Sequence, residues 1–544
     1  MTVAPAPLSR RALLALLLAL AAIWLGSLDY RKLVDPDEGR YAEIAREMVA
    51  SGDWVTPHLD GLKYFEKPPL QYWATATAIT VFGQQEWTAR LWPATTSLLC
   101  VILIYFTGAR LFGRPAGLLA ASVLASSLLF LLIGHINTLD MGLCFFLQAG
   151  LSGFLLARRE PEHARRYMLA TWAALALAVL SKGLVSLVLP AATLIVYSLA
   201  SRDFSPWRRL HWVPGLLLFL AIAAPWHIAV SRANPDFVHF YFIHEHFERF
   251  LTKGHGRYQP WWYFLPILAA GALPWTLVMA QALSRAWRPH GETVMAKRFL
   301  LVWSVVVFCF FSASGSKLAS YILPMFPALA LLAGEFLARI ERKALIAHLV
   351  LAALAAAVAI GLSTAVPGFA RDPAQQAATA RYALWLGGAA SLWLVGSVAA
   401  LLFAWRGLAR TALLMLSATA LAAGMATLLG HDVFAPTSSS YYLARQLPPT
   451  LNRPFYSLRM YDQTLPFYLD RTLTLVEYRD ELSFGLDSEP EKGLPTIAAF
   501  VERWNGDREA YAVMGEATYQ ELAKENLPML IVARDAHRIV VRTP

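Results

Sequence analysis

Long runs of apolar residues recur along the first four fifths of the chain, separated by short polar segments. A helix that crosses a bilayer needs about 20 mostly apolar residues, because its backbone must satisfy its own hydrogen bonds within the lipid. The pattern predicts thirteen such helices, at residues 12–28, 86–109, 115–134, 139–157, 167–181, 183–200, 211–230, 261–283, 299–313, 319–338, 344–366, 383–405 and 411–430. The two short runs that flank Ser181-Lys182-Gly183 are also compatible with a re-entrant hairpin.

The first run raises the question of a signal peptide, since Arg10 and Arg11 precede it. No small-x-small cleavage site follows Trp24, and the polar segment Asp29–Lys32 comes next. We therefore expect an uncleaved membrane anchor.

The composition agrees with a polytopic membrane protein. The 544 residues are 57% hydrophobic and 15% charged, against roughly 45–50% and 25% in soluble domains, and the mean hydropathy is +0.46. Cys100, Cys144 and Cys309 lie in apolar runs without C-x-x-C spacing, so we expect neither a disulfide framework nor a thiolate metal site.

The net charge of +10 comes largely from short loops between the predicted spans. Lys and Arg concentrate in inside loops, and with the N-terminus inside, every inside loop is basic. These loops carry Arg10 and Arg11; Arg110 and Arg114; Arg158, Arg159, Arg165 and Arg166; Arg202, Arg208 and Arg209; Arg285, Arg288, Lys297 and Arg298; Arg339, Arg342 and Lys343; and Arg406 and Arg410. The charge therefore needs no nucleic-acid partner.

With thirteen spans, the C-terminal residues lie outside the membrane. Charged residues become more frequent after about residue 430, and short β-like runs appear at Thr472–Val476 and Met529–Val532. The fold class predicted is an α-helical polytopic membrane protein with a C-terminal α/β domain. We place the transmembrane domain at residues 1–430 and the soluble domain at residues 431–544.

The first outside loop, residues 29–71, holds nine acidic side chains in a chain otherwise poor in charge. After Pro36 the pattern can enter a helix with Asp37 in its first turn, where the helix dipole favours anions. Arg40 and Tyr41 follow at spacings of three and four, so all three side chains can share one face. The alternative is an interfacial helix with an ordinary i,i+3 ion pair.

A second polar cluster, Tyr64–Leu70, ends this loop. Pro68 and Pro69 restrict the backbone and hold Lys67 extended, where its ammonium suits a phosphate oxygen. Simple snorkelling of Lys67 to the membrane surface is the alternative.

Other polar residues fall on the predicted outer side. Asp140 begins an apolar helix, where a carboxylate is costly and often functional, although helix capping explains it equally well. The loop at residues 231–260 contains Arg257 and places His244 one helical turn from Glu248. This spacing is a weak metal signal, and because it matches no known zinc motif it favours a solvated amphipathic helix. Lys317 lies before the tenth span and either binds an anion or snorkels.

Together these carboxylates and cations fit chemistry on a lipid that carries phosphate. Cations neutralise a phosphate leaving group, and a carboxylate acts as a base or a metal ligand. The chain has no G-x-x-x-x-G-K-[ST], G-x-S-x-G or H-E-x-x-H motif, so ATP-driven transport, serine hydrolysis and zinc proteolysis are unsupported.

The motifs resemble those of the GT-C glycosyltransferases of the protein O-mannosyltransferase-like superfamily. The segments that carry the resemblance are Asp37–Glu43, Tyr64–Trp73, Asn137–Met141, Ser181–Gly183, Ile243–Phe250, Gln259–Pro266 and Ser316–Pro324. Within this superfamily they look most like the lipid A aminoarabinose transferases, as does Tyr461–Leu469 in the C-terminal segment.

The resemblance implies an inverting, metal-linked transferase at the periplasmic face of the bacterial inner membrane. Its donor would be a sugar on undecaprenyl phosphate, its acceptor a phosphate of lipid A, and its cofactor a divalent metal such as Mg²⁺ or Zn²⁺. The implied roles are catalysis for Asp37, Asp140 and Arg40, binding of substrate for Tyr41, Tyr64, Lys67, Arg257, Lys317 and Tyr321, and metal ligation for Glu66 with His244 as a weaker candidate.

Other functions stay open at this point. A related enzyme would transfer a polyprenyl-linked sugar to protein Ser/Thr or to another glycan. A lipid flippase would place charges within half-helices at the bilayer midplane, whereas this sequence places them in loops. A structural scaffold would leave the acidic motif unexplained.

Overall fold

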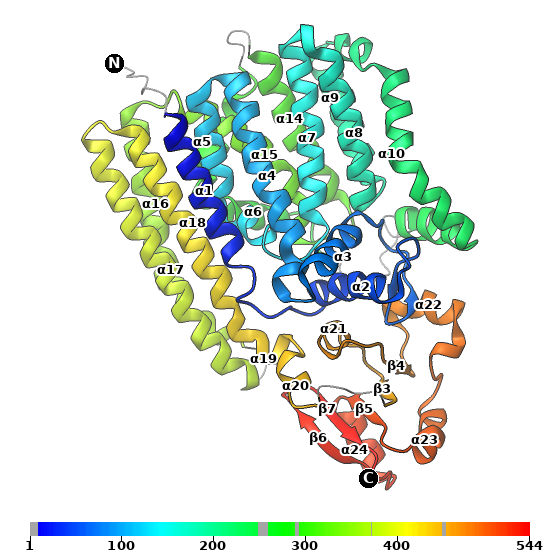
Figure 1. The fold of residues 1–544 in the computed structure, drawn as a ribbon. Helices are drawn as coiled ribbons and strands as arrows, with labels where there is room; N and C mark the ends of the chain where they lie inside the picture. Colours follow the sequence, from blue (N-terminus) through cyan, green and yellow to red (C-terminus); the bar gives the residue numbers. More distant parts are fainter. Residues whose placement is uncertain (1–8, 249–258, 289–292, 371–372, 449–452) are drawn as a thin grey trace. The chain divides into compact units, whose positions relative to one another are not determined.

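The computed structural model describes residues 9–544 apart from 249–258, 289–292, 371–372 and 449–452 (Figure 1). The chain forms two compact units. The first, here called the helical unit, comprises residues 1–27, 92–365 and 383–429. The second, here called the loop–sheet unit, comprises residues 28–91, 366–382 and 430–544, so the C-terminal segment joins the first loop in one unit.

Helices dominate residues 10–27 and 86–430. They are α1 (Arg10–Gly26), α4 (Glu86–Phe112), α5 (Arg114–Ala125), α6 (Leu128–Ile133), α7 (Asp140–Arg159), α8 (Ala164–Lys182), α9 (Val185–Ser201), α10 (Trp212–Ala233), α12 (Phe264–Gly271), α13 (Thr276–Arg285), α14 (Val294–Ala313), α15 (Phe326–Leu337), α16 (Arg342–Ser363), α17 (Pro373–Trp405) and α18 (Ala409–Gly430). Shorter helical turns are η1 (Pro161–His163), η2 (Ser205–Arg209), the π-helix η3 (His239–Glu248), η4 (Ala319–Met325) and η5 (Val366–Phe369).

All thirteen apolar runs predicted from the sequence fall on helices. Among the described residues, eight helices are long and apolar enough to cross a membrane, and the bent pair α12–α13 makes a ninth if it counts as one span. The remaining runs fall on the shorter apolar helices 11–26, 114–125 and 185–201 and on α8. The chain is a multi-pass helical membrane protein.

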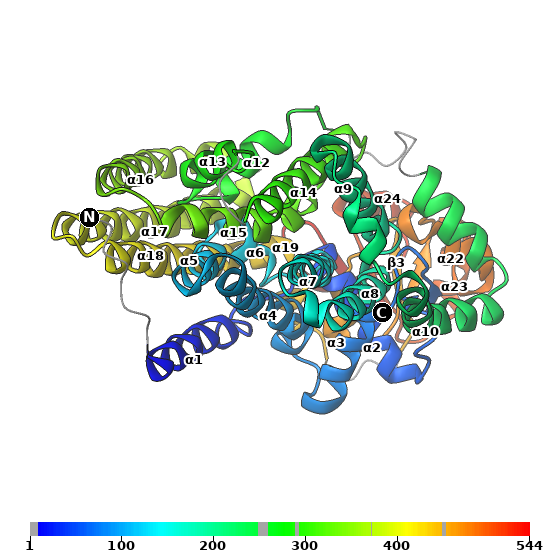
Figure 2. The same ribbon diagram turned by 90° about the horizontal axis from the view of Figure 1, so that it is seen from above.

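The spans differ in how deeply they are buried. Asp140–Arg159 and Ala319–Leu337 are 89% and 94% buried, whereas Trp212–Ala233 and Arg342–Ser363 are each 22% buried. The helices α7 and α15 therefore form the interior of the helical unit, and α10 and α16 expose their apolar side chains outward. Figures 1 and 2 both show α7, α8 and α10 side by side.

Small residues let the interior helices approach closely. A Cβ atom placed on Gly334 of α15 would lie 2.4 Å from the carbonyl oxygen of Ala116 and 2.6 Å from Cβ of Ala120 on α5. Backbone-to-backbone contact of this kind is a common basis of helix association in membranes.

The loop–sheet unit begins with the predicted helix after Pro36. It contains α2 (Asp37–Ser51), β1 (His58–Leu59), β2 (Leu62–Lys63) and α3 (Leu70–Phe82). The hairpin between β1 and β2 turns at Asp60 and Gly61, whose φ angles of 57° and 74° are those of a type I′ turn.

The C-terminal segment forms a mixed sheet covered by helices on both faces. The strands are β3 (Phe455–Leu458), β4 (Thr474–Val476), β5 (Tyr511–Met514), β6 (Leu530–Arg534) and β7 (Ile539–Arg542), in the spatial order β4-β3-β5-β7-β6. The helices are η6 (His431–Phe434), α19 (Ala435–Ser438), α20 (Tyr441–Ala444), α21 (Leu465–Leu469), η7 (Asp480–Leu482), α22 (Ser483–Ser488), η8 (Pro490–Lys492), α23 (Ile497–Gly506) and α24 (Glu516–Lys524). β3 pairs in parallel with β4 and β5, and β7 pairs antiparallel with β5 and β6. The predicted α/β fold is confirmed.

Candidate active site

Most of the acidic residues of the first loop form bonds that hold the loop–sheet unit together. The carboxylate of Glu47 accepts hydrogen bonds from the amides of Asp60 and Gly61, at 2.6 and 2.8 Å, and so holds the β1–β2 turn. Glu43 pairs with Arg46 at 2.6 Å. The remaining acids in this role are Asp35, bonded by the amide of Gln463, Asp53, bonded by the amides of Val55 and Thr56, and Asp60, bonded by the amide of Leu473.

Glu38 and Arg90 fix the start of α2. Arg90 donates to both oxygens of the Glu38 carboxylate, with distances of 2.7 and 2.8 Å. The same guanidinium donates to the carbonyls of Leu28, Arg31 and Lys32 at 2.6–2.9 Å. Arg90 is only 1% exposed. Its bonds to three backbone carbonyls and to Glu38 hold the chain that leads into Asp37.

Asp37 and Arg40 lie on one face of α2, as the spacing predicts. Nη1 of Arg40 lies 2.9 Å from Oδ1 of Asp37, and its Nη2 lies 2.5 Å from Oε2 of Glu481. The Asp37 side chain is 34% exposed whereas that of Arg40 is 6% exposed. The guanidinium thus bridges the carboxylate of Glu481, whose side chain is 17% exposed, and the more exposed carboxylate of Asp37.

Tyr64 adds a buried phenol to this cluster. Burial lowers the pKa of Arg40, but the neighbouring Tyr64 and Glu481 outweigh it and raise that pKa above its ordinary value. Burial raises the pKa of Tyr64 well above its usual value. Nε of Arg40 and Oη of Tyr64 are both buried without a hydrogen-bond partner among the described residues. Unpaired buried donors are costly, so a ligand that reached these two atoms would relieve that cost. Tyr41 is also buried, with its ring 6.0 Å from that of Tyr72.

Glu66 and Lys67 complete the cluster from the second motif. Nζ of Lys67 lies 2.8 Å from the carbonyl oxygen of Glu66 and 3.9 Å from its carboxylate. Both side chains are 18% exposed, so the ammonium stays accessible to an anion.

Two carboxyl groups near Arg40 hold protons at unusually high pH. Burial raises the pKa of Glu481 to about 7; Arg40 opposes this increase, and the charge of Glu66 adds to it. Burial, together with the charge of Asp462, raises the pKa of Asp35 to about 6. The cluster therefore places several acidic groups close to one buried guanidinium.

A separate cluster in the helical unit contains Asp140 and Tyr321. The carboxylate of Asp140, at the first turn of α7, forms an ion pair with the ammonium of Lys182, the last residue of α8. Nζ of Lys182 also lies 4.7 Å from the centre of the Tyr321 ring. Gly183, with φ of 89°, ends α8 directly after this lysine.

Lys317 is only 4% exposed, and its ammonium donates to the carbonyls of Gln259 and Ser314. These bonds hold the segment before η4 in place. Two other predicted residues lie outside this description: Arg257 is not among the described residues, and of His244 only the backbone, in η3, is described.

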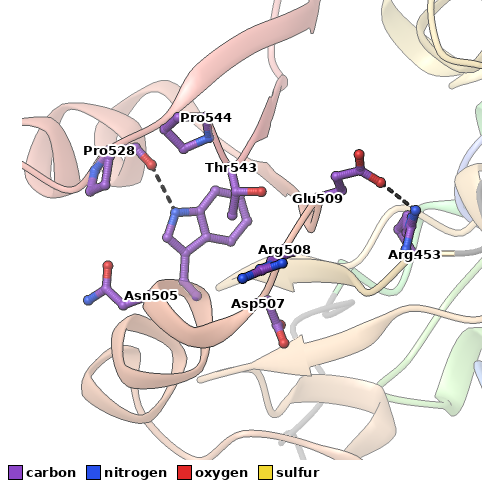
Figure 3. A pocket seen from close by; sticks show the side chains of 9 residues that line it. Arg453, Asn505, Asp507, Arg508, Glu509, Pro528, Thr543 and Pro544 are labelled. Atoms are coloured by element: carbon purple, nitrogen blue, oxygen red, sulfur yellow. Dashed lines mark hydrogen bonds and ion pairs between the residues drawn. The ribbon is translucent and has the colours of Figure 1, made fainter.

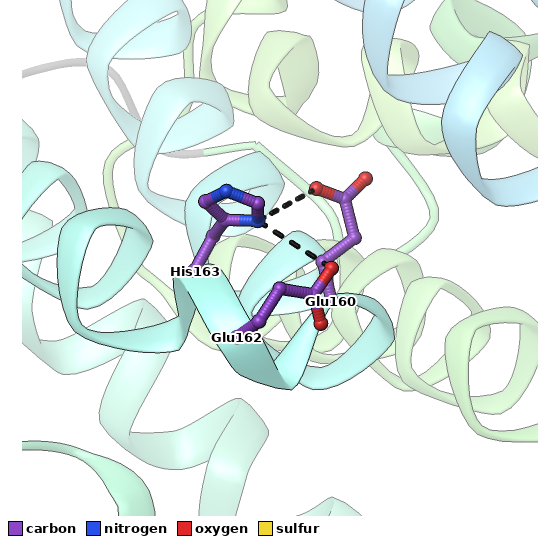
Figure 4. Close-up of side chains that lie close together, drawn as sticks. All are labelled: Glu160, Glu162 and His163. Atoms are coloured by element: carbon purple, nitrogen blue, oxygen red, sulfur yellow. Dashed lines mark ion pairs between the residues drawn. The ribbon is translucent and has the colours of Figure 1, made fainter.

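The predicted divalent metal stays a prediction. Glu66 and Glu481 offer carboxylate oxygens of the type that Mg²⁺ binds. Among the described residues, the one group of three acidic or histidine side chains close enough to share an ion is Glu160, Glu162 and His163, in the turn between α7 and α8 (Figure 4). Oε2 of Glu160 in that group also lies 3.2 Å from Arg110 and 2.7 Å from the Tyr167 hydroxyl.

The α/β sheet region has a surface cavity of about 560 Å³ beside α23 (Figure 3). Arg453 and Glu509 pair across it at 2.5 Å, and Trp504 donates to the carbonyl of Pro528 at 3.0 Å. None of the predicted site residues lines this cavity.

Three described residues of these clusters were not predicted: Arg90, Lys182 and Glu481. The sequence did contain a sign of Arg90 and Lys182, because each is a charged residue at the end of an apolar run. Glu481 carried none, because it lies in an ordinary acidic stretch far along the chain from Arg40.

Comparison with known proteins links both units to one family. The family model described as "Aminoarabinose transferase C-terminal domain" matches residues 443–543, and that described as "Dolichyl-phosphate-mannose-protein mannosyltransferase" matches residues 9–244. The crystal structure of ArnT from Cupriavidus metallidurans bound to undecaprenyl phosphate is 37% identical over 98% of both chains, with a TM-score of 0.93. This chain belongs to the ArnT family.

Other relatives agree with this family. The undecaprenyl phosphate-alpha-4-amino-4-deoxy-L-arabinose arabinosyl transferase of Erwinia tasmaniensis is 37% identical over 318 residues, which are 57% of each chain. The match to such curated ArnT relatives thus spans less than two thirds of their length. An oligosaccharyltransferase of Archaeoglobus fulgidus shares the fold alone, at 13% identity and a TM-score of 0.53. The family predicted from the sequence motifs is confirmed.

Proposed function

We propose that this chain transfers 4-amino-4-deoxy-L-arabinose from undecaprenyl phosphate to a phosphate of lipid A. The observation that carries the proposal is the 37% identity to ArnT of Cupriavidus metallidurans along 98% of both chains. The match of residues 443–543 to the aminoarabinose transferase C-terminal model favours this acceptor over protein Ser/Thr. The active site and the C-terminal segment lie on the periplasmic side in this proposal, opposite the basic loops.

In the proposed reaction an oxygen of the lipid A phosphate attacks the anomeric carbon of the sugar. The bond from that carbon to undecaprenyl phosphate breaks, with inversion, and the phosphate leaves with the electron pair. Arg40 and Lys67 stabilise its negative charge, as cations do for phosphate leaving groups. The free Nε of Arg40 and hydroxyl of Tyr64 provide two further donors.

Asp37 is the carboxylate that orients the acceptor or the sugar amine. A lipid A phosphate is already ionised at neutral pH, so the attack does not require a strong base. A divalent cation held by Glu66 and Glu481, either Mg²⁺ or Zn²⁺, would add charge neutralisation for the donor phosphate. The roles of Asp140 and Tyr321, in the other compact unit, are proposed from the family motif and from their shared contact with Lys182.

The test is mass spectrometry of lipid A from a host that makes the donor but lacks its own transferase. The host expresses the unmodified chain, Asp37→Asn, or Asp29→Asn as a matched control, since Asp29 is an exposed acid of the same loop. We expect the unmodified chain and the control to add the aminopentose mass, and Asp37→Asn to lower that product about 100-fold or more. Unchanged lipid A in every strain, at equal membrane expression, would contradict the proposal and point to another acceptor.

A further inference from the structure

A basic cavity of about 390 Å³ lies at one end of the helical unit. It is bounded by the end of α13, the start of α14, the end of α15 and the start of α16, which Figure 2 shows grouped together. Its charged lining is Arg285, Arg288, Lys297, Arg339, Glu335 and Glu341. None of the residues assigned above to sugar transfer lines it.

Positive charge is in excess in this cavity, with four cations and two carboxylates. Glu335, nearly buried, lies 3.4 Å from both Lys297 and Arg339 and is therefore already neutralised. Arg285 and Arg288 are exposed and form no ion pair with a carboxylate among the described residues. The guanidinium of Arg285 is instead held over the Phe336 ring, 5.0 Å from its centre.

The ends of candidate membrane spans place the cavity at the expected level of lipid head groups. Three candidate membrane spans, Met295–Ala313, Ala319–Leu337 and Arg342–Ser363, begin or end at it. Spans of 19 to 22 residues are about 30 Å long at 1.5 Å per residue, the thickness of the hydrocarbon core. Trp287, 39% exposed and 4.9 Å from the guanidinium of Arg298, is an aromatic side chain of the kind that gathers at this interface.

We infer that this cavity binds the phosphate head group of an anionic membrane lipid. A guanidinium group can donate two parallel hydrogen bonds to two oxygens of one phosphate. Basic pockets between membrane helices are suited to such head groups. A soluble phosphate compound carries the same chemistry. The apolar lining from Leu332, Phe336 and Ile340 favours a lipid, because it can cover the first carbons of the acyl chains.

The test uses the purified full chain in a neutral detergent, with native mass spectrometry and thermal unfolding as readouts. Phosphatidylglycerol is the anionic lipid, phosphatidylcholine the neutral comparison and inorganic pyrophosphate the soluble phosphate. The variant is Arg285→Gln/Arg288→Gln, which leaves the buried Lys297–Glu335 pair intact. The matched control is Arg208→Gln/Arg209→Gln, which removes two exposed arginines from η2, outside the cavity.

We expect one saturable phosphatidylglycerol adduct that raises the unfolding temperature of the unmodified chain and of the control. In the cavity variant the affinity for this lipid falls about tenfold or more. Equal affinity in both double variants would overturn the assignment. Stabilisation by pyrophosphate without stabilisation by phosphatidylglycerol would overturn the lipid as the ligand.

Discussion

At the scale of single residues, the partners of each charge determine which functional roles are available to it. Asp140 occupies the first turn of an apolar helix, where capping alone explains a carboxylate. In the folded chain its side chain is 9% exposed and paired with Lys182. Because burying a lone charge is expensive, this lysine is what makes the carboxylate tolerable at that position.

Lys182→Met therefore leaves a nearly buried carboxylate without its cation. We expect a destabilisation of about 3–5 kcal/mol, typical of breaking one side of a buried pair, while Lys182→Arg retains most of the stability. The measurement is the thermal unfolding temperature of the purified chain, with transfer activity measured in parallel.

The double variant Lys182→Met/Asp140→Asn distinguishes a role of Asp140 in stability from a role in sugar transfer. It removes both charges, so the stability should largely return. If Asp140 takes part in transfer, activity stays lost. An unchanged unfolding temperature in Lys182→Met would contradict the pairing.

At the scale of elements, α4 shows how one residue can organise a loop. Arg90 lies in the first turns of this helix and bonds three carbonyls and one carboxylate of the segment leading to α2. The helix predicted to begin after Pro36 is confirmed, and it spans Asp37–Ser51. Its start depends on a bond to Glu38 from 52 residues away in the sequence.

Arg90→Gln should loosen the chain between residues 28 and 38. It removes the main cation from Glu38, which Arg31 approaches only to 4.0 Å, at a cost of about 3 kcal/mol. Hydrogen exchange of the backbone amides in this segment should accelerate, and the unfolding temperature should fall.

Arg110→Gln is the control at the other end of α4. The Arg110–Glu160 pair is largely exposed, so its loss should cost less than about 1 kcal/mol. Equal effects of the two substitutions would show that Arg90 has no special part in the loop.

At the scale of the whole molecule, carboxyl groups with raised pKa values make stability depend on pH. The pKa of Glu481 is about 7 in the folded chain, above its ordinary value of 4.5. The folded state thus binds more protons than the unfolded state between these values, and stability falls as the pH rises through this window. Asp35, with a pKa of about 6, acts in the same direction.

Glu481→Gln should reduce this dependence. The unfolding temperature of the unmodified chain should fall more steeply from pH 5 to pH 7.5 than that of the variant, by an amount equivalent to about 3 kcal/mol at most. Glu502→Gln, in an exposed position on α23, should leave the slope unchanged. Parallel slopes in all three proteins would refute the elevated pKa of Glu481.

The sequence by itself determined the helical runs, the α/β character of the C-terminal segment, the helix at Asp37 and the family. These features are local: a span is a stretch of apolar residues, a helix start is a proline followed by acids, and a motif is a short string. The face shared by Asp37 and Arg40 follows from the helical repeat alone.

Only the tertiary structure decided which charges meet. Glu481 reaches Arg40, Lys182 reaches Asp140 and Arg90 reaches Glu38 across long separations in the chain. It also showed that most acids of the first loop, Asp37 included, hold backbone amides or arginines. Such pairings depend on how the folded elements pack. Because the partners lie far apart in the chain, no local sequence pattern predicts them.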